Sequence, residues 1–406
     1  MVESRSVLKV MLLTEFLMVP MLASVLHNSV REASSSNTPT FQKGMSYTTY
    51  ANMTPDAFGS AESDESLRRM KKVGVDWVAI NVVGWYQTNA YSADIHKNPK
   101  QAPTDDALIH VIQSVHNLSM KVMLKPMIDL EDGRWRGEIQ PSHTWFENYT
   151  SYINFFAEFA NQNRVEMFCV GTELYETVTW ETEWRGIISG VRQRYSGPLT
   201  YAAVWWKEYN DLVRWWDALD YVGIDAYFPL SSRNDPAITE MKATWDKITS
   251  YIDLFYSKVK KPIVFTEIGF LAINGTNQDP SNYKLQWDMT RAVDLQEQAD
   301  CYEATLQSVW NKSWFYGMYW WYWQTNPNAA MATPGTDYNG TLRDYTPQNK
   351  PAQGVITHWY SLEKEPGTAG TIDYAPYVIN VVSLVAVVEA AMISFLWRRR
   401  KVVPKG

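Results

Sequence analysis

Two glutamates end two runs of apolar, strand-forming residues. Glu173 follows "FCVGT" at 168–172, Glu267 follows "PIVFT" at 262–266, and a threonine directly precedes each of them. We therefore expect each carboxylate where a buried strand emerges into a loop. Two carboxylates in one site suit glycoside hydrolysis, with one as general acid toward the leaving oxygen and the other as nucleophile or base on the opposite face of the sugar. A lone glutamate at a strand end is more often a structural ion-pair partner, but a matching second one weakens that interpretation.

The chain between about residues 40 and 362 alternates short β-rich runs with helix-length amphipathic segments. In the clearest helical segment, 104–120, Thr104 can cap the start and an apolar stripe follows. The segment 63–74 closes on Gly74, in the position of a helix C-cap. The eight predicted strands are 41–47, 75–83, 121–128, 165–172, 198–205, 220–227, 262–270 and 315–323.

Eight strands, each followed by a helix, favour a closed parallel barrel over an open doubly wound sheet. The predicted fold is therefore the (β/α)8 or TIM barrel of the α/β class, over residues 40–362. No glycine-rich phosphate loop follows any predicted strand. In such a barrel, functional residues gather at the carboxyl ends of the strands. Glu173 at the end of the fourth strand and Glu267 near the end of the seventh are expected to face each other across the mouth.

The composition supports a large folded domain and excludes several functions. The 406 residues carry a net charge of −7, and the only basic cluster lies in the last nine residues, so a nucleic-acid partner has no electrostatic support. The 19 Trp and 24 Tyr suit both a barrel core and a cleft that stacks sugar rings. Six histidines show no metal-ligand spacing, and we expect neither a metal nor another cofactor. Cys169 and Cys301 are expected to be buried free thiols.

The C-terminal region contains a candidate membrane span. Residues 377–397 are largely apolar, with Glu389 as the one acidic residue, and match the ~20 residues that cross a bilayer as a helix. The basic run "RRRK" follows at once, which predicts a transmembrane helix with a cytoplasmic tail at 398–406. A juxtamembrane linker is expected at 363–376. A buried C-terminal helix is the alternative.

In the N-terminal region, residues 1–27, Arg5 and Lys9 precede a largely apolar run at 10–26. This order is typical of a signal peptide, with an uncleaved anchor as the alternative. Six Asn-x-Ser/Thr sequons agree with a secretory route, because a sequon is used only at a surface site of a secreted chain. We therefore expect a single-pass membrane glycoprotein with a luminal or extracellular catalytic domain. The sequons are at Asn52, Asn117, Asn148, Asn274, Asn311 and Asn339.

Seven runs of the sequence together resemble one known family, glycoside hydrolase family 113, whose characterised members are β-mannanases and related β-mannosidic enzymes. The similarity extends in the same order over about residues 40–362. The runs are "KVMLKPMIDLEDGRWRGEI", "FCVGTEL", "SGPLTYAAVWW", "DYVGIDAYFPL", "KPIVFTEIGF", "DLQEQADCYEA" and "GMYWWYW".

This resemblance implies a retaining barrel hydrolase with the acid/base on the fourth strand and the nucleophile on the seventh. Glu173 is then the acid/base and Glu267 the nucleophile. Many members of the same clan carry Asn directly before the acid/base, where this chain has Thr172. The usual contact to the sugar 2-hydroxyl is therefore lost or is supplied by another residue.

Further candidates for the site lie at other strand ends. Tyr227, at the end of the sixth strand, is placed to hydrogen-bond the nucleophile, as a tyrosine does in many such enzymes, or is a core residue. Trp321 or Trp320, at the end of the eighth strand, could stack under the sugar in the −1 subsite. Only one of two adjacent strand residues faces inward, and we prefer Trp321. Asp225 is expected to be a member of a buried network rather than a third catalytic acid.

The remaining candidates would bind substrate. Lys125 and Asp129, at the end of the third strand, could bind sugar hydroxyls or form a buried ion pair. Trp85 after the second strand and Trp205 at the fifth are candidate sugar platforms.

The predicted function is a membrane-anchored retaining β-glycosidase acting on β-linked, in particular β-mannosidic, oligo- or polysaccharides. A transglycosylase that remodels glycans would use the same residues and differ in how well it excludes water from the acceptor side. The third hypothesis is a catalytically weak carbohydrate-binding surface protein, although a binding module has no need of both glutamates.

Overall fold

A computed structural model of the protein describes residues 40–330 and 342–364. The predicted N-terminal segment, the transmembrane segment, the tail, most of the linker and the sequon at Asn339 lie outside these residues. Within them, no helix combines the length and apolar character needed to cross a bilayer.

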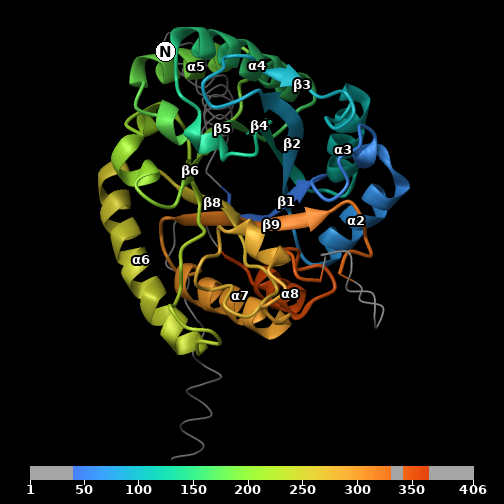
Figure 1. Cartoon of the computed structure of the whole chain (residues 1–406), viewed down its shortest axis with the longest axis vertical. Helices are drawn as coiled ribbons and strands as arrows, with labels where there is room; N and C mark the ends of the chain where they lie inside the picture. The colour runs from blue at the N-terminus through green and yellow to red at the C-terminus, as the bar shows by residue number, and fades with distance from the viewer. Residues whose placement is uncertain (1–39, 331–341, 365–406) are drawn as a thin grey trace, which may run out of the picture. The chain divides into compact units, whose positions relative to one another are not determined.

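Eight parallel strands close into a barrel, as predicted (Figure 1). Each strand pairs with its neighbours in chain order, and β1 closes the ring by pairing with both β2 and β9. A two-residue strand, β3 (His96–Lys97), adds an antiparallel pairing to β2 that was not predicted. The barrel strands are β1 (Gln42–Thr48), β2 (Trp77–Gln87), β4 (Lys121–Leu130), β5 (Met167–Thr172), β6 (Leu199–Val204), β7 (Val222–Asp225), β8 (Ile263–Ile268) and β9 (Phe315–Gln324).

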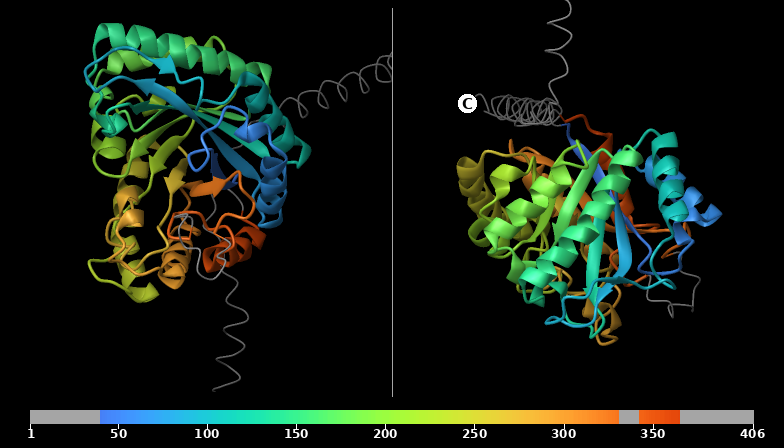
Figure 2. Two further views of the ribbon diagram at one scale, coloured as in Figure 1. Left: turned by 45° about the vertical axis from the view of Figure 1, so that its right-hand side comes forward. Right: turned by 90° about the horizontal axis from the view of Figure 1, so that it is seen from above.

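Helices surround the barrel and bury the outer faces of its strands (Figure 2). Because the strands are covered on both faces, β5, β6, β7 and β8 are buried along their whole length, as is usual for parallel sheets. The helices are α2 (Ala61–Lys72), α3 (Asp105–Asn117), α4 (His143–Gln162), α5 (Glu181–Arg192), α6 (Ile238–Val259), α7 (Leu295–Val309) and α8 (Pro351–Ser361).

One connection departs from the predicted strand–helix alternation. Between β6 and β7 the chain makes only a π-helical turn, η4 (Glu208–Leu212), and a 3-10 turn, η5 (Trp216–Ala218). Trp215, in this connection, is fully buried, and its ring stacks on Trp184 of α5 with 4.8 Å between ring centres. The connection therefore contributes a large aromatic ring to the core although it contains no α-helix.

Several local predictions are confirmed. The Thr104 side chain accepts a hydrogen bond from the Ala107 backbone at 3.1 Å and caps α3. Gly74 follows α2 with a φ of +96°, a left-handed conformation that glycine adopts at no steric cost. Cys169 in β5 and Cys301 in α7 are both buried and free.

Candidate active site

Glu267 lies inside β8 and is almost completely enclosed, with 5% of its surface exposed. One carboxylate oxygen accepts a hydrogen bond from the Lys125 ammonium of β4. The other accepts from the Tyr227 hydroxyl, just after β7, at 2.9 Å. Each carboxylate oxygen thus accepts a hydrogen bond from a different part of the barrel, which fixes the orientation of the carboxylate.

Lys125 joins Glu267 to a second buried carboxylate. Its ammonium lies 3.6 Å from Oδ2 of Asp225, whose Oδ1 accepts a hydrogen bond from Thr266 at 2.7 Å. Burial, and then the Glu267 charge, raise the pKa of Asp225 well above its usual value. Burial opposes the charge on Lys125, but Asp225 and Glu267 outweigh it and raise the pKa of Lys125. Of the two predicted roles for Lys125, the structure gives it the buried ion pair; Asp225 is a network member, as predicted.

Glu173 follows β5 directly and has a φ of +51°. Left-handed backbone is uncommon for a residue other than glycine and concentrates at functional sites. Its backbone N–H donates to the Ala202 carbonyl of β6 at 2.8 Å, and its Oε2 accepts from the Trp135 indole at 2.9 Å. Burial and the nearby Glu267 charge raise the pKa of Glu173, against the opposing effects of Arg136 and Trp135. A raised pKa suits a general acid, and the influence of Glu267 places the two carboxylates in one electrostatic environment.

A polar group from the carboxyl ends of β1 and β4 lies beside the pair. Arg136, in the 3-10 turn η2 (Arg136–Glu138), donates to Asp129 at 2.5 Å and to the Tyr50 hydroxyl at 3.0 Å. Tyr50 in turn donates to Asp129 at 2.8 Å. Burial opposes the charge on Arg136, but Asp129, and then Tyr50 and the two glutamates of the site, outweigh it and raise the pKa of Arg136, so this cation compensates the carboxylates. Asp129 thus forms an ion pair with Arg136, which is the second of its two predicted roles; the first was hydrogen bonding to sugar hydroxyls.

Sequence reasoning did not single out Tyr50, Trp135 or Arg136. Trp135 and Arg136 lie in the run "DGRWRGEI", which carries the family resemblance, so a signal for them was present. Tyr50 follows the first strand, but nothing in its sequence neighbourhood distinguishes it from other tyrosines.

The two adjacent tryptophans of β9 face opposite sides of the barrel wall. Trp320 is fully buried and stacks on Tyr302 of α7 with 3.9 Å between ring centres. Trp321 is partly exposed, lies 6.0 Å from the Tyr50 ring, and packs with Tyr227 in the apolar group at the mouth. Trp320 is therefore a core residue, whereas Trp321 is the one at the mouth.

The other predicted platforms differ in position. Trp85 packs edge-on against Tyr152 and Phe156 of α4, so its ring belongs to the contact between barrel and helix rather than to the site. Trp205 is partly exposed and packs with Tyr227 and Trp321 at the mouth. Thr172 ends β5 and is 3% exposed.

A cluster of three rings, Trp135, Tyr175 and Trp206, lies beside Glu173. Tyr175, in the turn η3 (Tyr175–Thr177), stacks on Trp206 with 4.7 Å between ring centres, and Trp135 lies 6.3 Å from Trp206. Trp206 is 38% exposed. These partly exposed faces, next to the carboxylate that Trp135 contacts, can stack on a sugar ring.

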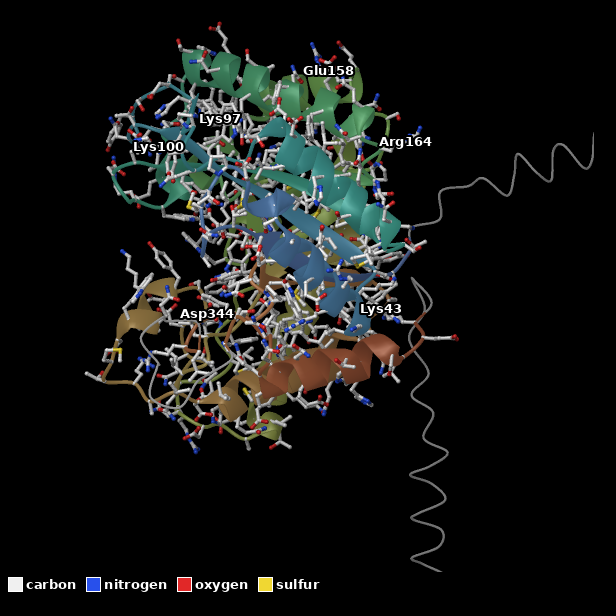
Figure 3. All side chains as sticks on the ribbon, turned by 90° about the vertical axis from the view of Figure 1, so that its right-hand side faces the viewer. Lys43, Lys97, Lys100, Glu158, Arg164 and Asp344 are labelled. Atoms are coloured by element: carbon white, nitrogen blue, oxygen red, sulfur yellow. The ribbon has the colours of Figure 1, made fainter. Side chains whose placement is uncertain are left out.

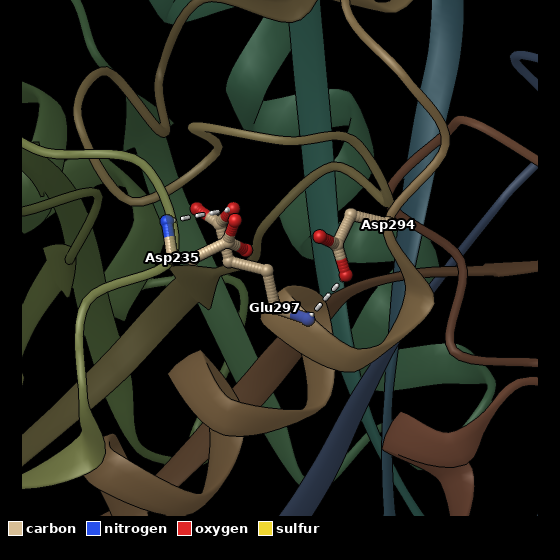
Figure 4. A group of neighbouring side chains, drawn as sticks. All are labelled: Asp235, Asp294 and Glu297. Carbon is tan, nitrogen blue, oxygen red and sulfur yellow. Dashed lines mark hydrogen bonds between the residues drawn. The ribbon is translucent and has the colours of Figure 1, made fainter.

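The structure also brings together a second acidic group, formed by Asp235, Asp294 and Glu297 (Figure 4). Protein donors already bind these carboxylates: Glu297 accepts from the Gly275 backbone at 2.8 Å, and Asp294 caps α7 by accepting from the Glu297 backbone at 2.8 Å. Asp235 accepts from the Asn274 side chain at 3.0 Å. We interpret the group as an anchor for the loops that follow β7 and β8.

The loop before α8 is held down by a further buried network. Asp344, labelled in Figure 3, is enclosed, and its carboxylate accepts from Lys350 at 3.1 Å and from Gln324 of β9 at 2.6 Å. Burial raises the pKa of Asp344 and lowers that of Lys350. The network places Tyr345 with its ring centre 6.2 Å from that of Tyr227, so this loop completes one side of the mouth.

A (β/α)8 barrel with two glutamates at the carboxyl ends of its strands, surrounded by partly exposed aromatic rings, defines a glycoside hydrolase. The sequence profile of Glycoside Hydrolase Family 113 matches residues 45–341. The chain therefore belongs to glycoside hydrolase family 113, and its substrate is a carbohydrate.

Solved structures of the same family agree with this assignment. A family 113 β-1,4-mannanase is 29% identical with a TM-score of 0.68, and a complex of such a mannanase is 28% identical with a TM-score of 0.69; both comparisons cover 80% of this chain and 100% of the other. A family 113 β-mannanase from Alicyclobacillus acidocaldarius, in complex with ManMIm, is 26% identical with a TM-score of 0.68, over 79% of this chain and 97% of the other. No curated protein matches the chain.

Proposed function

We propose that the protein hydrolyses β-mannosidic bonds with retention of configuration, using Glu267 as nucleophile and Glu173 as acid/base. In the first step the Glu267 carboxylate attacks the anomeric carbon while Glu173 protonates the departing oxygen. In the second, Glu173 takes a proton from water, the water oxygen attacks the same carbon, and Glu267 leaves as a carboxylate. The mannanase activity of the solved family members supports the choice of substrate.

The different environments of the two carboxylates carry this assignment. Glu267 contacts the Lys125 ammonium and the Tyr227 hydroxyl, which stabilise an anion ready to attack. Glu173 has a raised pKa, which favours the protonated form that the first step needs. Two carboxyl groups whose surroundings differ in this way divide the acid and nucleophile roles between them.

The test is azide rescue of two alanine variants with an activated aryl β-mannoside. Each variant is expected to lose several orders of magnitude of turnover, because both groups act in one transition state. In Glu173→Ala, the good leaving group still departs, and azide attacks the glycosyl-enzyme to give a β-glycosyl azide. In Glu267→Ala, no covalent intermediate forms, and any azide product is α. Glu158→Ala, on the exposed face of α4 (Figure 3), is the control and keeps wild-type turnover.

Inverted azide products would reverse the two roles. Full activity in both variants, on a substrate that the wild type cleaves, would place the site elsewhere.

Transglycosylation is the second candidate, because one observation favours it. The leaving-group side of the bond lies next to the acid/base, and the ring cluster of Trp135, Tyr175 and Trp206 lies beside Glu173. Such rings would also hold an incoming sugar acceptor. Product analysis with added mannose oligosaccharide separates the two functions: longer products indicate transfer, and shorter products alone indicate hydrolysis.

We also propose that the protein is a single-pass membrane protein with its catalytic domain in the lumen or outside the cell. The apolar run at 377–397 and the basic residues that follow it support this topology. Protease treatment of sealed microsomes should remove the tail at 398–406 and leave the barrel intact. A shielded tail with a digested barrel would contradict the proposed orientation.

A further inference from the structure

Glu208 is a fully buried carboxyl group in η4 that the proposed mechanism does not use. Its two oxygens accept hydrogen bonds of 2.6 Å, one from the Tyr201 hydroxyl and one from the Val204 backbone. The residue before it, Lys207, has a φ of +53°. A left-handed residue other than glycine persists only where the surrounding structure enforces it, so this turn is built around the buried carboxyl group.

Tyr201 connects Glu208 to the turn that carries Glu173. Its hydroxyl accepts a hydrogen bond from the Leu174 backbone N–H at 2.8 Å while it donates to Glu208. The backbone N–H of Glu173 itself donates to the Ala202 carbonyl at 2.8 Å. Two consecutive peptide groups at the candidate acid/base are therefore held by β6, one directly and one through Tyr201.

We propose that Glu208 is a positioning residue. It acts through the Tyr201 hydroxyl to hold the turn formed by left-handed Glu173 and the following Leu174, and thereby orients the acid/base toward the scissile oxygen. The proposal rests on the acid/base role of Glu173 proposed above. Neither Glu208 nor Tyr201 touches substrate in this scheme.

The electrostatics of the site connect Glu208 to Glu173 as well. Burial raises the pKa of Glu208 to about 8, and the Glu173 charge contributes to the rise. The titratable groups facing Glu208 are Tyr201 on β6, and Glu173 and Tyr175 on the segment after β5. The interaction is mutual, so an ionised Glu208 favours the protonated form of Glu173. Ionisation of Glu208 therefore helps to keep the general acid protonated as the pH rises through about 8.

The test compares Tyr201→Phe, Glu208→Gln and the control Tyr195→Phe in the full-length protein, with β-1,4-linked mannose oligosaccharide as substrate. Tyr195 is also a buried tyrosine, and its hydroxyl donates to the Val165 carbonyl at 2.9 Å, but it has no link to Glu173. A displacement of a catalytic group by 1 Å costs on the order of 100-fold in rate. The remaining hydrogen bond from Glu173 to Ala202 limits the movement of Glu173. Tyr201→Phe should therefore lower kcat about tenfold with little change in KM. Tyr195→Phe should leave both constants unchanged.

Glu208→Gln removes the ionisable group that helps to keep Glu173 protonated at alkaline pH. The activity of this variant should therefore fall more steeply on the alkaline side than that of the wild type. The ratio of wild-type to variant kcat/KM should rise as the pH passes about 8, because only the wild type gains the Glu208 charge there. A constant ratio, or a kcat loss in Tyr201→Phe no larger than in Tyr195→Phe, would overturn the inference. Loss of turnover in Glu173→Ala tests the proposed function separately. If that loss is observed together with either of these two results, only the positioning role is overturned.

Discussion

Replacing Trp135 with phenylalanine should shift the pH dependence of catalysis with little change at the optimum. The indole N–H of Trp135 donates to Oε2 of Glu173 at 2.9 Å, and this hydrogen bond lowers the pKa of Glu173 against the effects of burial and of Glu267. Phenylalanine keeps an aromatic ring in the cluster but has no donor. The ionised form of Glu173 therefore loses a stabilising contact, and the pKa of Glu173 must rise further.

The size of the shift follows from the strength of the lost contact. A hydrogen bond to a charged group contributes about 1.5–3 kcal/mol, and the lower end applies here because Glu173 is partly exposed. About 1.4 kcal/mol corresponds to one pKa unit. Since Glu173 acts as general acid when protonated, the alkaline limb of the kcat/KM profile should move to higher pH by about one unit.

The assay is the pH profile of kcat/KM on β-1,4-linked mannose oligosaccharide, with Trp206→Phe as the matched control. Trp206 belongs to the same ring cluster, and its indole makes no hydrogen bond to Glu173 among the described residues. The control should change KM and leave the alkaline limb in place. An unmoved limb in Trp135→Phe, or an equal movement in both variants, would refute the reasoning.

Three further substitutions test the residues in and around the mouth of the barrel. Lys125→Met leaves two buried carboxylates without their shared cation, so the protein should lose about 3–5 kcal/mol of unfolding free energy, measured by denaturant unfolding. Unchanged stability would show that the ion pair is not needed. Trp320→Ala should cost about 3–5 kcal/mol of stability with kcat/KM retained in the folded fraction. Trp321→Ala should lower kcat/KM while thermal unfolding changes little, and the opposite pattern would reverse their assigned faces.

Local patterns in the sequence were sufficient to predict the barrel and the positions of its two strand-end glutamates. Each strand is a short run of β-formers between turn signals, and a parallel barrel places the carboxyl ends of such strands at one mouth. Glu173 and Glu267 could be chosen because each ends a run of this kind after a threonine. Helix caps such as Thr104 depend only on neighbours in the chain, and they too were predictable.

The partners of these residues were decided by tertiary structure. The indole of Trp135 reaches Glu173 across 38 positions in the chain, and Lys125 reaches Glu267 across 142, so no local pattern contains either pair. Trp320 and Trp321 are adjacent and chemically identical, and only the helix packed outside β9 makes one core and leaves the other at the mouth. The raised pKa of Glu173 likewise arises from burial and from the charges of distant residues brought close by barrel closure. The type of each side chain is given by the local sequence, whereas its pKa depends on the burial and the charges that the folded structure places around it.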